Sequence, residues 1–244
     1  MVLCTPSNPC GTMYSEAELR ALGAVVAEAA KSTAPDLVIV VDEIYERIVY
    51  GGIPHFSIGS IPAIAERTIT INGLSKAYSM TGWRAGYTTT SGEWGLKFMK
   101  AMAVMQGQMT TNITSFIYPA IRTALRECDA DATRFCEAFG KRAALIHARM
   151  SRIPGLVVPR PTGAFYAFPD ISALFGKKSA EGRAIGSALE FCEALLAETR
   201  VAAVPGDDFG GCGKNHVRFS FACSEETIAK GMDRLEGFVR GLRS

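Results

Sequence analysis

Five apolar residues in a row, Leu37–Val41, end abruptly at Asp42. An uninterrupted run of this length is typical of a β-strand that is buried on both faces, as in a parallel sheet covered by helices. Residues 68–72 and 86–90 have the composition of two further strands. The first half of the chain therefore predicts an α/β domain, in which ligands bind beyond the carboxyl ends of the strands.

A helix is predicted ahead of the Leu37–Val41 strand. Ser15 and Glu18 have the spacing of a capping box, in which each side chain accepts the backbone N–H of the other residue. Behind them, apolar residues recur at helical spacing: Leu19, Leu22 and Val26. Because proline cannot continue a helix, we expect Pro35 to end this one.

The second half of the chain predicts shorter elements in a mixed order. Helices are expected at 114–127, 130–150, 183–199 and 224–242, and short strands at 156–158, 164–168, 201–204 and 216–222. Such a mixture is typical of an α+β domain. We therefore expect two domains, at residues 1–125 and 126–244.

The overall composition narrows the functional classes. The chain has 244 residues and a formal net charge of +2, which gives no support for a nucleic-acid or membrane partner. No apolar run approaches the ~20 residues of a membrane-spanning helix. The seven cysteines form no C-x-x-C pair, which indicates reduced thiols and a cytoplasmic location. The three histidines lie far apart in the sequence, so we expect no metal centre.

The strand at 68–72 is followed by a lysine in a setting suited to covalent catalysis. Lys76 follows Ser75, and the Gly-flanked Arg84 comes shortly afterwards. A lysine amine that attacks a carbonyl group needs a fixed place. A nearby arginine can hold a phosphate with two hydrogen bonds, and a serine hydroxyl can add a third. This arrangement predicts a pyridoxal phosphate (PLP) site, with Lys76 as the imine-forming residue.

Asp42 and Tyr45 form a second candidate group, at the end of the buried strand. A carboxylate there can pair with a protonated pyridine nitrogen, which keeps the ring able to accept electrons. An apolar strand followed by Asp-Glu is also typical of the Mg²⁺-binding segment of an ATPase, but that interpretation requires a P-loop, G-x-x-x-x-G-K-[ST]. The nearest segment has Asp208 in place of the first glycine and Asn215 in place of Ser or Thr, so we reject it.

Two further segments present polar side chains from a fixed backbone. Pro9 and Gly11 favour a rigid turn that presents the amide of Asn8. Residues 217–221 alternate between apolar and polar, the pattern of a half-buried strand. Arg218 is therefore expected to point away from the core, where its planar guanidinium suits a substrate carboxylate.

Taken in order, these segments resemble the class I/II (fold type I) PLP-dependent aminotransferases, particularly the aspartate aminotransferase subgroup I-gamma. The resemblance covers nearly the whole chain, and these motifs carry it: Ser7-Asn8-Pro9-Cys10-Gly11, Asp42-Glu43-Ile44-Tyr45, Ser75-Lys76, Gly82-Trp83-Arg84-Ala85-Gly86-Tyr87, Gly163-Ala164-Phe165-Tyr166, Val204-Pro205-Gly206 and Val217-Arg218-Phe219-Ser220. Cys10 stands where the family has threonine. The resemblance implies that residues 1–125 are the C-terminal portion of the PLP-binding large domain and that 126–244 are the small domain.

The resemblance also implies roles for individual residues. Lys76 binds the cofactor covalently and moves a proton at the substrate Cα, Asp42 pairs with the pyridine nitrogen, and Tyr45 bonds the ring hydroxyl. The polar side chains that hold PLP in the family correspond here to Asn8, Asp42, Tyr45, Ser75, Lys76 and Arg84.

Substrate and partner follow from the same resemblance. Arg218, with Asn8 beside it, grips the α-carboxylate of the substrate, which is an α-amino acid or a 2-oxo acid. Residues 111–112 resemble a stretch that approaches the site of a neighbouring subunit, which implies a homodimer.

The family chain begins well upstream of the Asn-Pro turn, with a Gly-rich phosphate loop, an aromatic ring that stacks on PLP and residues that select the substrate side chain. We therefore expect this chain alone to bind PLP weakly and to turn over poorly. Lysine, aspartate and arginine do not separate an aminotransferase from a β-lyase or a decarboxylase on the same scaffold. A non-catalytic remnant or dimerisation module also stays open.

Overall fold

The computed structural model describes residues 1–243, which form two compact units. Unit 1 contains Met1–Pro6 and Met13–Glu137, and unit 2 contains Ser7–Thr12 and the residues from Ala138 onwards. The segment Ser7–Thr12 therefore belongs to unit 2 although it lies near the start of the chain. The assignment of functional domains to 1–125 and 126–244 stays a prediction.

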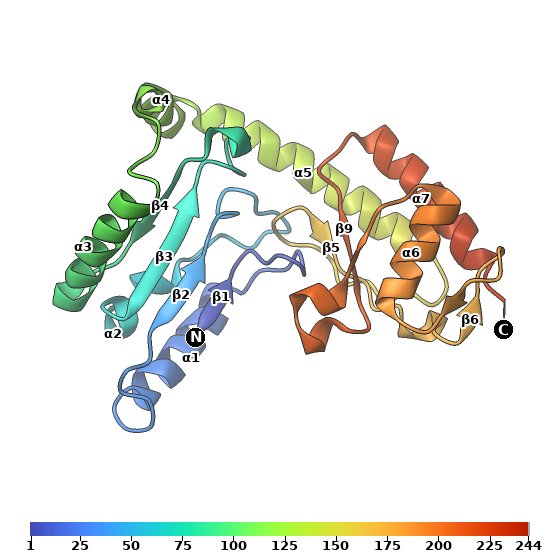
Figure 1. Cartoon of the computed structure of the whole chain (residues 1–244), viewed down its shortest axis with the longest axis horizontal. Coiled ribbons are helices and arrows are strands. Elements are labelled where there is room, and N and C mark those ends of the chain that lie inside the picture. Colours follow the sequence, from blue (N-terminus) through green and yellow to red (C-terminus); the bar gives the residue numbers. More distant parts are fainter. Residues whose placement is uncertain (244) are drawn as a thin grey trace. The chain divides into compact units, whose positions relative to one another are not determined.

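Unit 1 is built on a four-stranded sheet (Figure 1). Its strands, in spatial order, are β1 (Val2–Cys4), β2 (Ile39–Asp42), β3 (Thr68–Gly73) and β4 (Gly86–Thr89). The pairs β1–β2 and β2–β3 are parallel, and β4 runs antiparallel to β3. The predicted α/β class with a mostly parallel sheet is confirmed, and the predicted strands are present with shifts of one or two residues at their ends.

One face of this sheet is covered by α1 (Glu16–Ala29), the 3₁₀-helix η1 (Ile58–Ser60) and the single-turn α2 (Pro62–Ala65). The buried side chains between sheet and helices are all aliphatic: Leu19, Val26, Ile39, Val41, Ile58, Ile61 and Ile64. Residues at alternate positions of β2 thus point into this core, as expected of a pleated strand.

The ends of α1 test two sequence predictions. The capping box is confirmed, because Ser15 N–H donates to Glu18 Oε2 at 2.7 Å and Glu18 N–H donates to Ser15 Oγ at 3.3 Å. The prediction that Pro35 ends the helix is wrong. The helix stops at Ala29, where Ala34 N–H donates to the Ala29 carbonyl at 2.8 Å and closes the last turn before the proline is reached.

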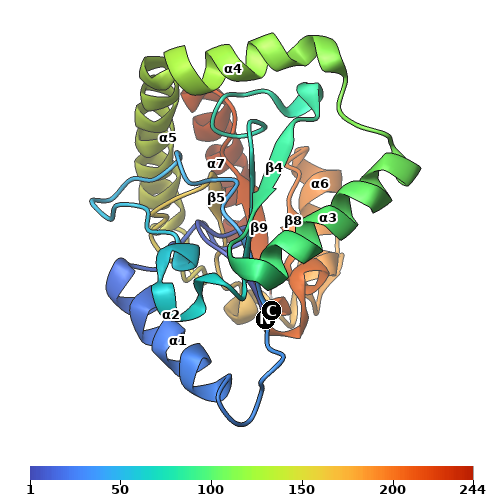
Figure 2. The ribbon, with the colours of Figure 1, turned by 90° about the vertical axis from the view of Figure 1, so that its left-hand side faces the viewer.

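The rest of unit 1 is helical. It holds η2 (Thr81–Trp83), α3 (Gly92–Met109), η3 (Ser115–Ile117), α4 (Tyr118–Glu127) and the first part of α5 (Asp129–Met150). Sequence reasoning missed α3. The reason is physical: Gly95 is its only buried residue, so no apolar stripe marks a buried face. Figure 2 shows α3 at the front of this unit.

Unit 2 contains a three-stranded antiparallel sheet in the order β5 (Tyr166–Ala167), β9 (Val217–Ser220), β8 (Val204–Pro205). A hairpin of β6 (Lys177–Lys178) and β7 (Ala184–Ile185) and three short 3₁₀-helices accompany it: η4 (Ser172–Leu174), η5 (Gly206–Phe209) and η6 (Gly211–Gly213). The large buried side chains include Phe191, Leu195, Phe221 and Leu235. This mixture is the predicted α+β texture.

Two helices pack in unit 2 besides the remainder of α5. The helix α7 (Glu225–Arg240) begins at the predicted N-cap, since Ser224 Oγ accepts the N–H of Thr227 at 3.1 Å. The helix predicted at 183–199 is shorter, α6 (Ala188–Thr199), because residues 184–185 pair in the hairpin and Ser187 is its N-cap. Among residues 1–243, no helix is long and apolar enough to cross a membrane.

Candidate active site

Two predicted catalytic residues follow the carboxyl ends of neighbouring parallel strands. Asp42 is the last residue of β2, and Lys76 comes shortly after the end of β3. The carboxyl ends of parallel neighbours share one edge of a sheet, which is where ligands bind in such folds. The sheet therefore places both residues at that edge of unit 1.

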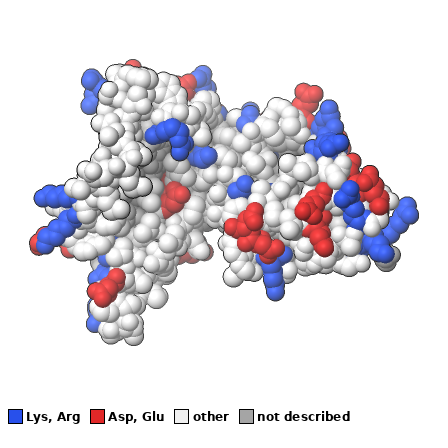
Figure 3. Space-filling view, in the orientation of Figure 1, with Lys and Arg blue, Asp and Glu red and all other residues white. Residues whose placement is uncertain are grey.

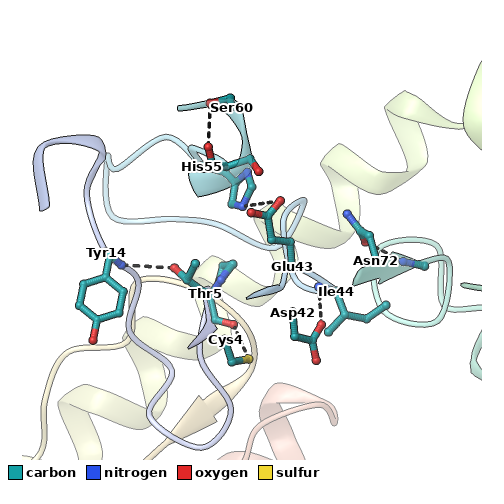
Figure 4. A network of polar contacts seen from close by, with 12 residues as sticks. Cys4, Thr5, Tyr14, Asp42, Glu43, Ile44, His55, Ser60 and Asn72 are labelled. Atoms are coloured by element: carbon teal, nitrogen blue, oxygen red, sulfur yellow. Dashed lines mark hydrogen bonds and ion pairs between the residues drawn. The ribbon is translucent and has the colours of Figure 1, made fainter. Parts of the chain in front are cut away.

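The carboxylate of Asp42 is oriented by its own turn. Its Oδ1 accepts the N–H of Ile44 at 3.0 Å, and its backbone carbonyl accepts the N–H of Thr5 at 3.1 Å (Figure 4). Tyr45 follows in the same turn and is 3% exposed. Asp42 is thus fixed by both neighbouring segments of backbone.

The predicted phosphate ligands lie with Lys76 in one closed loop, residues 74–85. The loop is closed at its base, where Leu74 N–H donates to the Ala85 carbonyl at 3.2 Å. Gly73 and Gly86 face each other below it, and a Cβ on Gly73 would lie 2.9 Å from the Ala85 carbonyl oxygen. The base of the loop therefore has no room for a larger residue at Gly73.

Side chains also link the two arms of this loop. The hydroxyl of Thr81 donates to the Ser75 carbonyl at 2.8 Å, and Arg84 Nη1 donates to the Thr81 carbonyl at 2.9 Å. Arg84 has a φ of 55°, in the left-handed region, which costs an L-residue about 1 kcal/mol. The loop holds this conformation and so sets the direction in which Arg84 leaves the backbone.

Arg84 lines a cavity of about 730 Å³ that is open to solvent. Residues of the turn after α3 line it too, among them Thr110, Asn112 and Phe116. The stretch 111–112, which the resemblance connects with a neighbouring subunit, thus lies on the same surface as the predicted phosphate ligand.

The two remaining predicted residues belong to unit 2. Asn8 stands in the turn Ser7–Thr12, and Arg218 on the central strand β9, where Val217 and Phe219 are buried and Arg218 is half-buried. This is the predicted alternation. The Nη1 of Arg218 donates to Asn8 Oδ1 at 2.8 Å, so the structure brings these two residues together.

Glu43, next to Asp42, belongs to a buried polar network that sequence reasoning did not find (Figure 4). Glu43 is 2% exposed, and its Oε2 lies 3.8 Å from His55 Nε2, too long for a hydrogen bond. Glu46 lies near both residues. One carboxylate oxygen of Glu43, one of Glu46 and one ring nitrogen of His55, atoms of the kind that can bind a metal ion, lie within 4.8 Å of one another. The expectation that the protein holds no metal stays a prediction.

Burial decides the protonation of this pair. Burial raises the pKa of the Glu43 carboxyl to about 7, against a smaller lowering by a hydrogen bond from Ser57. Burial also lowers the pKa of His55, whose ring donates to the Thr5 carbonyl. Both groups are therefore favoured in their neutral forms, as expected where charge is removed from water.

The raised pKa of Glu43 makes the stability of unit 1 dependent on pH. Between its unfolded value of 4.5 and about 7, the folded state binds the proton more tightly, so the free energy of unfolding falls as pH rises through this range. The lowered pKa of His55 acts in the opposite sense, with stability lost as pH falls. Glu43→Gln removes only the contribution of Glu43. The free energy of unfolding of this variant, relative to that of the wild type, should therefore rise by roughly 3 kcal/mol between pH 4.5 and 8.

Urea unfolding followed by tryptophan fluorescence measures this difference, because both tryptophans, Trp83 and Trp94, lie in unit 1. The control is Glu28→Gln, the same replacement at an exposed carboxylate on α1, and it should not reproduce this gain. A gain that is absent in Glu43→Gln, or equal in the control, contradicts the assignment.

The sequence of the chain is similar to those of known proteins. The family Aminotransferase class I and II matches residues 1–235. The chain belongs to this family. It is 39% identical to an aspartate aminotransferase of Bacillus subtilis (strain 168) over 240 residues, which are 98% of this chain and 57% of that protein. It is 37% identical to an aspartate/prephenate aminotransferase of Cereibacter sphaeroides, again over 98% of this chain and 57% of the relative.

The fold of the chain is also similar to that of a solved aminotransferase structure. The aspartate aminotransferase of Rhizobium meliloti matches with a TM-score of 0.90 at 35% identity, over 99% of this chain and 58% of that one. The resemblance to class I/II aminotransferases of fold type I is therefore confirmed. The chain spans a little over half the length of these relatives.

Two features of this aminotransferase-family chain escaped sequence reasoning. Glu43 and His55 are separated by a loop, and nothing in their spacing indicates that they meet. Phe209 stands in a glycine-rich run that attracted notice only as an incomplete P-loop, and the structure places its ring against Arg218. The alternation of β9 indicated that Arg218 points away from the core, but gave no sign of an aromatic contact.

Proposed function

We propose that this protein is a PLP-dependent aminotransferase that moves an amino group between an α-amino acid and a 2-oxo acid. The observation that carries the proposal is the placement of Lys76 and Asp42 after the carboxyl ends of two neighbouring parallel strands. An amine and a carboxylate at such an edge match the two reactive parts of the cofactor, its carbonyl carbon and its ring nitrogen. Membership of the aminotransferase family supports the proposal.

The donor set of unit 1 fits PLP. The loop that holds the Lys76 amine also carries the hydroxyl of Ser75 and the guanidinium of Arg84, which suit the three oxygens of a phosphate. The phenol of Tyr45 is the proposed ligand of the ring hydroxyl from unit 1, and the amide of Asn8, a residue of unit 2, is proposed for the same hydroxyl. When bound, PLP supplies the electron sink that makes bonds to the substrate Cα breakable.

The protein's own residues control proton positions and orientation. Asp42 keeps a proton on the pyridine nitrogen through a charge-assisted hydrogen bond, and the turn to Ile44 holds the carboxylate in place for that bond. The amine of Lys76 removes the proton at the substrate Cα and returns it during transfer. Arg218 pairs with the substrate carboxylate, and Asn8 orients Arg218 through the hydrogen bond to Nη1.

The amino donor, the assembly and the location are parts of the same proposal. The relatives named above are named for aspartate, so we propose aspartate as the first donor to test. A homodimer is supported by the exposed apolar side chains of α3, where Leu96 is 62% and Met109 76% exposed. Figure 3 shows mostly uncharged residues over this part of unit 1, with charged residues along its outer edge. Seven cysteines, none of them in a disulfide among residues 1–243, support the cytoplasm.

A half-reaction tests the chemistry. The 244-residue chain is mixed with PLP and L-aspartate without an acceptor, and the products are separated by chromatography. We expect pyridoxamine phosphate and the 2-oxo acid of the donor, in equal amounts. Pyruvate with free ammonia from L-cysteine, which carries a leaving group on Cβ, indicates a β-lyase. Formation of an amine, or of alanine from aspartate, with carbon dioxide and no pyridoxamine phosphate indicates a decarboxylase, and an unchanged mixture with a panel of amino acids indicates a non-catalytic role. Each of these three results contradicts the proposal.

A further inference from the structure

The guanidinium of Arg218 is held by more than its hydrogen bond. The ring of Tyr166 lies 4.7 Å and the ring of Phe209 4.9 Å from its central carbon, both measured to the ring centroid. A cation over aromatic rings at this distance is attracted by their π-electrons. Tyr166 is 6% exposed, and the aromatic contacts replace water on the guanidinium.

The position of Phe209 is fixed by an unusual backbone contact. Phe209 ends η5, and the next 3₁₀-helix, η6, packs against its start. Gly206 and Gly213 meet there so closely that a Cβ on Gly206 would lie 2.1 Å from the Gly213 carbonyl oxygen. Only glycine fits at these two positions, which explains the first and the last glycine of the glycine-rich run between 206 and 213.

A chain of aromatic contacts supports the ring from behind. The edge of Phe168 meets Phe209 at 6.2 Å between centroids, and Phe168 stacks on the imidazole of His216 at 4.8 Å. Phe168 is 7% exposed, so this support is part of the core of unit 2. Phe209 itself is only half-buried, and its ring lies against the guanidinium of Arg218.

The remaining hydrogen-bond donors of the Arg218 guanidinium decide which ligand it can bind. Nη1 is used by Asn8, whereas the buried Nε has no hydrogen-bond partner in the part of the chain that the structure describes. A buried N–H without an acceptor is costly, so this atom favours an incoming acceptor. Nε and the neighbouring Nη2 form one planar edge of the guanidinium, which matches the two oxygens of a carboxylate.

We propose that Phe209 is a positioning residue for substrate binding, and that it holds Arg218 so that the Nε edge receives the substrate carboxylate. The inference rests on the proposed function, which assigns Arg218 to that carboxylate. Without the ring, the guanidinium can rotate away from Asn8 and water can reach its face, so each carboxylate must displace water and reorder the side chain. Loss of a desolvated cation–π contact of this kind should weaken carboxylate binding about tenfold.

The test follows the Nε–H signal of Arg218 by ¹⁵N NMR in the 244-residue chain, with Arg218→Lys used to identify the signal. Pyruvate is the probe, since it is a 2-oxo acid with a single carboxylate, and acetone is the matched ketone without one. We expect pyruvate, and not acetone, to shift the signal in a saturable way. Phe209→Leu should raise the dissociation constant of pyruvate about tenfold, and Phe209→Tyr, which keeps the ring, should restore it.

The control variant is Phe175→Leu, which removes a half-buried phenylalanine of unit 2 that makes no ring contact with Arg218. It should leave the pyruvate titration unchanged. The inference is overturned if pyruvate does not move the Nε–H signal, if Phe209→Leu binds as the wild type does, or if Phe175→Leu weakens binding equally. Because the titration needs neither PLP nor turnover, these results are distinct from a failed half-reaction, which would overturn the proposed function alone.

Discussion

Replacing Lys76 with alanine should abolish both the yellow absorbance of protein-bound PLP and the half-reaction with an amino acid. In the proposed function, this side chain supplies both the amine that attacks the cofactor carbonyl and the base that acts at the substrate Cα, so two functions should be lost together. We expect the single-turnover rate to fall by roughly 10⁴-fold. Stopped-flow absorbance of the chain at saturating PLP measures this rate.

The matched control is Lys100→Ala, which removes an exposed lysine of α3. It should leave the spectrum and the rate unchanged. Reduction with borohydride followed by peptide mapping gives an independent check, because it labels the lysine that carries the cofactor. A label on any lysine other than Lys76 would falsify the assignment.

Asp42→Asn should leave the fold intact and slow the removal of the Cα proton by roughly 10²- to 10³-fold. Asparagine keeps an oxygen that can accept the N–H of Ile44, so the turn after β2 is preserved while the negative charge is lost. In the proposed function Asp42 pairs with the pyridine nitrogen, so loss of the charge should leave that nitrogen less readily protonated and the ring a weaker electron acceptor. The deuterium isotope effect on the half-reaction, measured with Cα-deuterated substrate, shows whether this step has become slower.

Asp36→Asn is the control for this experiment, since Asp36 is an exposed carboxylate that precedes the same strand. Its rate should equal that of the wild type. A wild-type rate in Asp42→Asn itself would remove Asp42 from the catalytic group. A lowered unfolding midpoint in tryptophan fluorescence would instead indicate that Asp42 acts on the fold.

Much of the fold could be predicted because local signals and packing agree. The run at Leu37–Val41 is apolar throughout, and two of its residues, Ile39 and Val41, are fully buried against α1 and α2. The capping box at Ser15 and the N-cap of α7 at Ser224 are formed by hydrogen bonds between residues that are close in sequence. Such features need no information about distant segments.

The features that could not be predicted are those that depend on contacts between segments far apart in the sequence, or on the lack of such contacts. The helix α3 buries only Gly95, so its sequence carries no periodic apolar face. The meeting of Glu43 with His55 depends on the path of the loop between them. The ring of Phe209 reaches Arg218 because two glycines pack backbone against backbone, and a sequence pattern shows those glycines without showing what they meet.

The closed loop of residues 74–85 makes Lys76 and the proposed phosphate ligands Ser75 and Arg84 a transplantable block. Its base is sealed by Leu74 and Ala85, and its arms are tied through Thr81, so the spacing between amine and guanidinium is set inside these twelve residues. An exchange of the whole loop between relatives should therefore conserve that spacing, provided that Gly73 and Gly86 are kept. Asp42 cannot travel with the block, because its place depends on the register of β2 against β3, and natural recombination within this family is accordingly expected to leave that strand pair undivided.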